Sequence, residues 1–159
     1  MTGQDPHGLC RFLRAQGCIY DTAVERLRRG TCHADWTHAI FPPLAGLSRD
    51  ETTERFALRS IDEAAAYLEH AVLGARYRRC VGELAPHLAK PPYCLFGPCD
   101  TMRLWSSLTL FESVEPAPAF TAVLDAWFAG RREERTLARL GRTAPHGGPG
   151  NRSGPGRHR

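Results

Sequence analysis

Residues 60–84, SIDEAAAYLEHAVLGARYRRCVGEL, decide the fold class. Ser60 and Glu63 form the Ser-x-x-Glu capping box that begins a helix. Apolar residues then share one face in each half: Ile61, Ala64, Ala65 and Leu68 in the first, and Leu73, Tyr77, Cys80, Val81 and Leu84 in the second. A spacing of three or four residues is typical of amphipathic helices, so the stretch predicts two consecutive helices.

Helical patterns continue on both sides of this stretch. They predict helices over about 8–16, 21–30, 48–58, 99–111, 120–130 and 133–140. Ser48 with Glu51 makes a second capping box, and Gly30 supplies a stop. Only Tyr93–Phe96 is predicted as a short extended piece. The sequence therefore predicts an all-α fold, a single compact domain of about six to eight helices over residues 1–140.

The cleanest amphipathic pattern lies near the end of this domain, and its apolar members are Phe120, Val123, Leu124, Trp127 and Phe128. The pattern predicts that Trp127 is buried. Its replacement by alanine would then cost roughly 3–5 kcal/mol.

The composition changes sharply after Leu140. Residues 141–159, GRTAPHGGPGNRSGPGRHR, are rich in Gly, Pro and Arg and contain one aliphatic side chain, Ala144. Such a segment buries too little surface to offset the entropy of ordering it, so we predict a disordered tail. The four tail arginines also account for the whole net charge of +4, because the first 140 residues hold 17 basic and 17 acidic side chains. A neutral domain predicts no specific binding to nucleic acid.

The chain has no run of about 18 apolar residues, the length that a membrane-spanning helix needs. Its first residues contain no apolar segment typical of a secretion signal. These two features predict a cytoplasmic protein without a membrane partner.

Six cysteines are present, namely Cys10, Cys18, Cys32, Cys80, Cys94 and Cys99. Reduced thiols are expected in the cytosol, and no Cys-x-x-Cys pair suggests zinc. His33, Asp35 and His38 form a His-x-Asp-x-x-His run, but no second cluster supplies the remaining ligands. The sequence therefore predicts no metal site and no cofactor.

Five runs of residues carry a resemblance to a known family. They are Arg11–Gln16 with Tyr20, Ala23, Leu27 and Gly30; Trp36 with Ile40–Pro42 and Leu44–Leu47; Glu63–Ala64, Tyr67–Leu68, His70, Val72–Gly74, Arg76 and Cys80; Phe96–Gly97, Asp100, Leu104, Ser106–Ser107 and Thr109–Phe111; and Phe120, Val123–Asp125, Phe128, Gly130, Thr136–Leu137 and Leu140. In this order they resemble the bacterial domain of unknown function 1810 (DUF1810), whose members are sometimes mislabelled calpastatin. The resemblance spans residues 8–140 and implies an all-helical fold, but the family supplies no activity to carry over.

The chain is a divergent member of that pattern. Asp35 replaces a histidine, His38 a tryptophan, Pro43 a glutamine and Arg103 a lysine. The resemblance implies that a ligand site built on these positions would be altered or lost here.

The segment from Gly97 to Phe111 carries the strongest candidate site. Asp100 and Arg103 are three residues apart and Arg103 and Ser107 four apart, so the three can cluster on one helix. Such a cluster near a helix start could bind an anion. A capped helix with an exposed ion pair explains the same residues without a ligand.

With Gln16, Trp36 and His38 as walls, the cluster suggests a small-molecule site for a nucleotide or an ADP-ribose-like ligand, with or without catalysis. The alternative hypothesis is a non-catalytic module that binds another protein. The sequence does not separate the two hypotheses, and it is silent on the oligomeric state.

Overall fold

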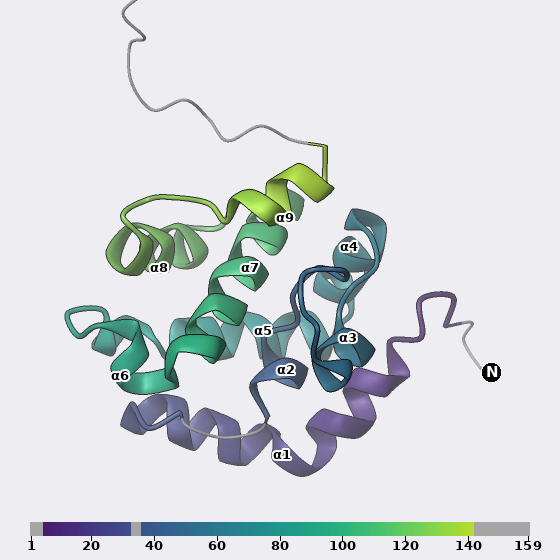
Figure 1. The fold of residues 1–159 in the computed structure, drawn as a ribbon. Coiled ribbons are helices and arrows are strands. Elements are labelled where there is room, and N and C mark those ends of the chain that lie inside the picture. Colours follow the sequence, from purple (N-terminus) through teal and green to yellow (C-terminus); the bar gives the residue numbers. More distant parts are fainter. Residues whose placement is uncertain (1–4, 33–35, 142–159) are drawn as a thin grey trace, which may run out of the picture.

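The computed structural model describes residues 5–32 and 36–141, and it confirms the predicted all-α fold. Nine α-helices and one short 3-10 helix follow one another along these residues (Figure 1). Their bounds are α1 Cys10–Arg29, α2 Thr37–Ile40, α3 Glu51–Phe56, α4 Ile61–Glu69, α5 Leu73–Gly82, η1 Ala85–His87, α6 Pro92–Phe96, α7 Pro98–Val114, α8 Pro118–Phe128 and α9 Glu134–Arg139. Extended pairing in the described residues is limited to one isolated bridge, between Leu44 and Leu58.

The first two predicted helices are one helix, α1, of 20 residues. Gly17 does not break it, because an isolated glycine inside a helix costs only about 1 kcal/mol and this one is exposed. The carboxylate of Asp5 accepts hydrogen bonds from the backbone N–H groups of Leu9 and Cys10, at 2.7 and 2.9 Å. Gly30 ends the helix as predicted, in the left-handed conformation with φ of 75°.

Residues Tyr93–Phe96, predicted as extended, lie instead in the helical turn α6. Pro92 suits the first turn of a helix, where its missing N–H costs nothing. Gly97 ends the turn with φ of 79°, a conformation that other residues disfavour. Proline and glycine therefore bracket one helical turn here. α2, a helix of four residues, was also not predicted, so the described residues hold nine α-helices, above the six to eight predicted, although the first two predicted helices are one.

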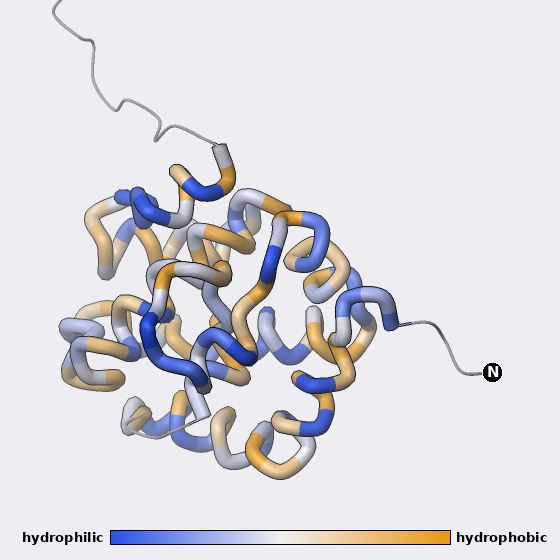
Figure 2. The backbone as a smooth tube through the Cα atoms, turned by 45° about the vertical axis from the view of Figure 1, so that its right-hand side comes forward, coloured by the Kyte–Doolittle hydropathy of each residue, from blue (hydrophilic) through white to orange (hydrophobic). Residues whose placement is uncertain are grey.

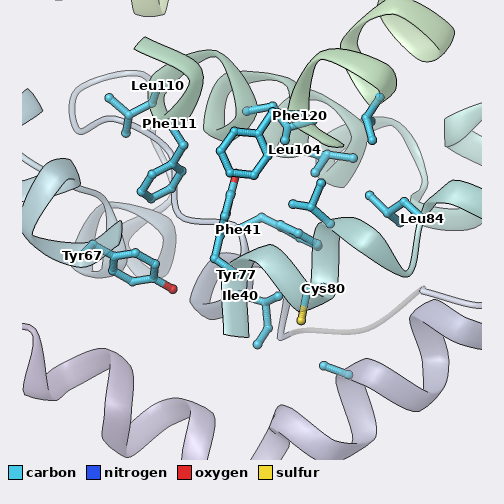
Figure 3. Packing of buried hydrophobic residues seen from close by; sticks show 14 of the residues in the cluster. Ile40, Phe41, Tyr67, Tyr77, Cys80, Leu84, Leu104, Leu110, Phe111 and Phe120 are labelled. Atoms are coloured by element: carbon cyan, nitrogen blue, oxygen red, sulfur yellow. The ribbon is translucent and has the colours of Figure 1, made fainter. Parts of the chain in front are cut away.

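α7 passes through the middle of the molecule and packs against α4, α6, α8 and α9 (Figure 1). Its Phe111 lies beside Tyr77 of α5, with 4.2 Å between the ring centroids. The ring of Tyr77 also lies 5.5 Å from that of Phe120 on α8 and 6.0 Å from that of Phe41. Figure 3 shows these rings meeting at the centre of the core. Four aromatic rings, from α5, α7, α8 and the residue that follows α2, thus pack together in the core.

Hydrophobic and hydrophilic residues alternate along the helices, as expected when each helix has one face in the core (Figure 2). No described helix combines the length and the apolar character needed to cross a membrane. Of the predicted tail, only Gly141 lies within the described residues.

The six thiols divide into two classes. Cys10, Cys18, Cys94 and Cys99 are exposed, whereas burial raises the pKa of both Cys32 and Cys80 to about 12. A buried thiol of high pKa forms little thiolate and reacts slowly. Titration of the native protein with a disulfide reagent at neutral pH should therefore modify four thiols rapidly and the other two only after denaturant is added. Rapid reaction of all six would contradict the burial of Cys32 and Cys80.

Candidate functional site

The guanidinium of Arg103 is the centre of a polar cluster. Its Nη1 donates to Asp100 Oδ1 at 2.6 Å and to Thr37 Oγ1 at 2.6 Å. Its Nη2 donates to Thr53 Oγ1 at 2.8 Å. The Thr37 hydroxyl in turn donates to Asp100 Oδ1 at 2.9 Å. Arg103 therefore ties α7 to α2 and α3, and the predicted pairing of Asp100 with Arg103 is present.

Asp50 extends this cluster at the start of α3. Its Oδ2 accepts from the backbone N–H of Thr53 at 2.9 Å and from the Thr53 hydroxyl at 2.7 Å. These hydrogen bonds hold the pKa of the Asp50 carboxyl below its usual range. Ser48, predicted to cap this helix, lies two residues earlier, and its Oγ accepts from the Asp50 N–H at 3.1 Å. Asp50 is the cap because α3 begins at Glu51.

A pocket of about 440 Å³ opens beside the cluster, and we call it the α3–α7 pocket. Its polar lining comes from Ser48, Asp50, Thr53, Arg103, Ser106 and Arg135. Its apolar lining comes from Pro43, Leu47, Cys99 and Met102. The pocket thus combines apolar walls with polar groups from four segments of the chain, as small-molecule sites commonly do.

The loop before α3 forms one wall of the pocket, and hydrogen bonds to a side chain of α3 hold this loop in place. The carboxylate of Glu54 accepts from Gly46 N–H at 2.9 and 3.0 Å and from Ser48 N–H at 3.2 Å. Gly46 has φ of 88°, and a Cβ atom there would meet the guanidinium of Arg139. The positive φ favours glycine at this position. The wall is therefore formed by the fold itself, before any ligand arrives.

The start of α9 contributes a further wall through Arg135. Glu133 is buried and caps this helix by accepting from the N–H groups of Arg135 and Thr136, at 3.1 and 2.9 Å. Burial raises the pKa of Glu133, but the hydrogen bonds from Thr136 and Arg135 together outweigh burial and lower it. Arg135 pairs with Glu133 at 3.2 Å and reaches the carbonyl of Leu47 at 3.4 Å.

Comparison with known proteins identifies the family of this chain. The family model described as a protein of unknown function, DUF1810, matches residues 6–140. The chain belongs to the DUF1810 family. A solved relative, the conserved hypothetical protein Rv1873 from Mycobacterium tuberculosis, is 37% identical, with a TM-score of 0.84 over 87% of this chain and 100% of its own. A search of curated proteins finds no match.

Two of the residues predicted to form the ligand site make hydrogen bonds inside the core instead. Gln16 is buried, and its Nε2 donates to the Ala39 carbonyl at 2.8 Å and to the Tyr67 hydroxyl at 2.9 Å. Ser107 is fully buried and shares a hydrogen bond of 3.0 Å with the Tyr77 hydroxyl. Neither lines the α3–α7 pocket. Both polar side chains are instead satisfied inside the core, as burial demands.

The two predicted aromatic walls are also placed away from this pocket. His38 lies on α2 with its ring 5.0 Å from that of Phe56. Trp36 is 7% exposed, and its Nε1 has no hydrogen-bond partner among the described residues. Of the predicted site residues, Arg103 alone lines the pocket, and Asp100 forms an ion pair with it at 2.6 Å without lining the pocket itself.

The departures from the DUF1810 pattern fall into two groups. Pro43 and Arg103, which replace the glutamine and the lysine of the family pattern, both line the pocket. His38 does not line it, and Asp35 and His33 lie outside the described residues. Within residues 5–32 and 36–141, no group of three or more His, Cys, Asp or Glu side chains is placed to hold a metal ion.

Sequence reasoning missed Asp50, Thr53 and Arg135. An aspartate followed three residues later by a threonine, as with Asp50 and Thr53, is typical of a helix start. The cap at Asp50 could therefore have been predicted. Arg135 had no such signal, because only the packing of α9 against α7 brings it to the pocket.

Proposed function

We propose that the α3–α7 pocket binds a small polar molecule of the nucleotide or ADP-ribose-like class. Its volume of about 440 Å³ lies in the range of small-molecule sites. Pro43, Leu47 and Met102 offer apolar surface to a flat ring, and hydroxyl and charged groups face the rest of the pocket.

The observation that carries the proposal is the rigid placement of Arg103. Three side-chain oxygens, from Thr37, Thr53 and Asp100, accept from its guanidinium at 2.6–2.8 Å. These partners hold a long side chain in one position at the wall of a pocket. A polar group fixed in advance loses little conformational entropy when a ligand arrives.

We propose binding without assigning a chemical step. Among the described residues that line the pocket there is no histidine, and the one thiol belongs to Cys99.

The competing hypothesis of a protein-interaction module has less support. The large apolar side chains that are exposed in the described residues are Val72, Tyr93 and Met102, from three different segments. Single exposed apolar residues are ordinary on a monomer surface.

Protection of Cys99 from alkylation tests the proposal. Cys99 is exposed and lines the pocket, whereas Cys94 is exposed and does not line it. A bound ligand should slow alkylation of Cys99, by roughly tenfold at ten times its dissociation constant, and leave Cys94 unchanged. Adenosine, AMP, NAD and ADP-ribose are the probes, and mass spectrometry of the labelled peptides is the measurement. Equal protection of both cysteines would contradict binding in this pocket.

A pocket-filling variant gives a second, independent measurement. A saturating ligand should stabilise the wild-type protein by about 2.7 kcal/mol at 100 times its dissociation constant. Cys99→Trp should abolish this stabilisation because the indole occupies the pocket, while the matched control Cys94→Trp should retain it. The proposal fails if none of the probes stabilises the wild-type protein, or if both variants respond alike.

A further inference from the structure

Three charged side chains line the α3–α7 pocket. They are Arg103 of α7, Arg135 of α9 and Asp50, which precedes α3, so the described lining carries two positive charges and one negative. The acids that pair with the arginines are Asp100 and Glu133, at 2.6 and 3.2 Å, and neither of them lines the pocket. A ligand in the pocket therefore meets more positive than negative charge, and an anionic group is attracted to it.

Both guanidinium groups keep donor hydrogens that the described residues do not use. A guanidinium has five N–H donors. In Arg103, three of them donate to side-chain oxygens at 2.6–2.8 Å, and the buried Nε has no partner among the described residues. In Arg135, Nε donates to Glu133 at 3.2 Å and Nη1 to the carbonyl of Leu47 at 3.4 Å. These two hydrogen bonds leave three of the five Arg135 donors without a partner in the part of the chain that the structure describes.

The pocket offers few acceptors in return. Asp50 is the one acid among the described residues that line it, and its Oδ2 already accepts from the N–H and the hydroxyl of Thr53, at 2.9 and 2.7 Å. Thr53 Oγ1 accepts from Arg103 at 2.8 Å. Ser48 Oγ accepts from the Asp50 N–H at 3.1 Å. With donors in surplus, the pocket suits a ligand group that supplies several acceptor oxygens.

We infer that the pocket holds its ligand by a phosphate group, which accepts hydrogen bonds from Arg103 and Arg135. The planar fork of donors on arginine matches the oxygens of a phosphate, and hydrogen bonds between two charged groups are stronger than neutral ones. The rest of the ligand lies along the apolar lining of Pro43, Leu47 and Met102. This inference rests on the proposed function and narrows its ligand class to nucleotides, as opposed to nucleosides.

Isothermal titration with matched ligands separates recognition of the phosphate from recognition of the nucleoside. AMP should bind roughly 10- to 100-fold more tightly than adenosine, the effect of gaining hydrogen bonds to charged groups. Added sodium chloride should weaken the binding of AMP and leave that of adenosine nearly unchanged, because salt screens the attraction between charges. Equal affinities for AMP and adenosine would overturn the inference while leaving the pocket as a binding site. If adenosine, AMP, NAD and ADP-ribose all fail to bind, the proposed function itself fails, and this inference with it.

Arg135→Gln isolates the contribution of the arginine on α9. The Arg135 side chain is 59% exposed, so the loss of its ion pair with Glu133 should cost little stability and α9 should remain folded. The variant should lose roughly tenfold or more in affinity for AMP, while its affinity for adenosine should stay within about twofold of the wild-type value. A purely structural role of Arg135 would instead weaken the binding of both ligands.

Arg131→Gln is the matched control for this variant. Arg131 is also an exposed arginine, lies just before α9 and does not line the pocket, so its replacement makes the same change in net charge away from the site. The control should keep the AMP affinity of the wild-type protein. Unchanged AMP affinity in folded Arg135→Gln, or an equal loss in Arg131→Gln, would overturn the inference.

Discussion

Replacing Phe111 with alanine is expected to lower the free energy of unfolding by about 3–5 kcal/mol. The Phe111 side chain is fully buried, and its ring lies 4.2 Å from the ring of Tyr77 and 5.3 Å from that of Tyr67. It stands where α4, α5 and α7 meet (Figure 3), so the fold cannot close the resulting cavity by moving one loop. Chemical denaturation measures the change, and thermal melting should show a drop of roughly 10–20 °C.

Trp127→Ala is the matched comparison, because it removes a large aromatic ring that is less buried than Phe111. The sequence predicted a buried Trp127, but the ring is half-buried, and its Nε1 donates to the Lys90 carbonyl at 2.8 Å. Its nearest aromatic partner is Phe96, at 6.1 Å. We therefore expect a cost of about 1–2 kcal/mol, well below the first prediction, because less apolar surface is returned to water. A cost equal to that of Phe111→Ala would contradict this view of the core.

The difference between these two aromatics shows how far periodicity can predict a fold. A stripe of apolar residues identifies the buried face of a helix, and Phe120, Val123 and Leu124 are buried as their spacing predicted. Periodicity does not show where that face stops, because the neighbouring elements decide it. At the C-terminal turn of α8, Trp127 and Phe128 pack against the core but are only partly buried.

Local chemistry was predicted more reliably than the contacts between distant residues. Ser60 caps α4, with its Oγ accepting from Glu63 N–H at 3.1 Å, as the capping box indicated. The pairing of Asp100 with Arg103 also follows from a spacing of three. The partners Thr37 and Thr53, however, lie 66 and 50 residues before Arg103. No local pattern encodes such contacts, because they depend on where α2 and α3 lie relative to α7.

The second large effect is expected at Glu133, where alanine should cost about 2–4 kcal/mol. Glu133 is 4% exposed, and its Oε2 accepts from the Thr136 hydroxyl at 2.6 Å and from its N–H at 2.9 Å. Alanine leaves these buried donors, and Ser106, without an acceptor. Because α9 also carries Arg135, the variant should lose ligand affinity as well as stability. Glu134→Ala is the control, since Glu134 is the exposed neighbour, and it should change stability by less than about 0.5 kcal/mol.

The pH dependence distinguishes the charge of Glu133 from its size. The folded protein lowers the pKa of Glu133 below the ordinary value of 4.5, because Thr136 and Arg135 stabilise the carboxylate more than burial destabilises it. The ionised carboxylate therefore stabilises the fold above about pH 4.5, and this stabilisation is lost as the pH falls through the lower, folded-state pKa. Glu133→Gln removes the charge and keeps the shape. The difference in unfolding free energy between the wild-type protein and Glu133→Gln should be constant from pH 6 to 8 and shrink steadily below about pH 4.5. A difference that stays the same down to pH 3 would mean that the cap acts through its shape alone, without its charge.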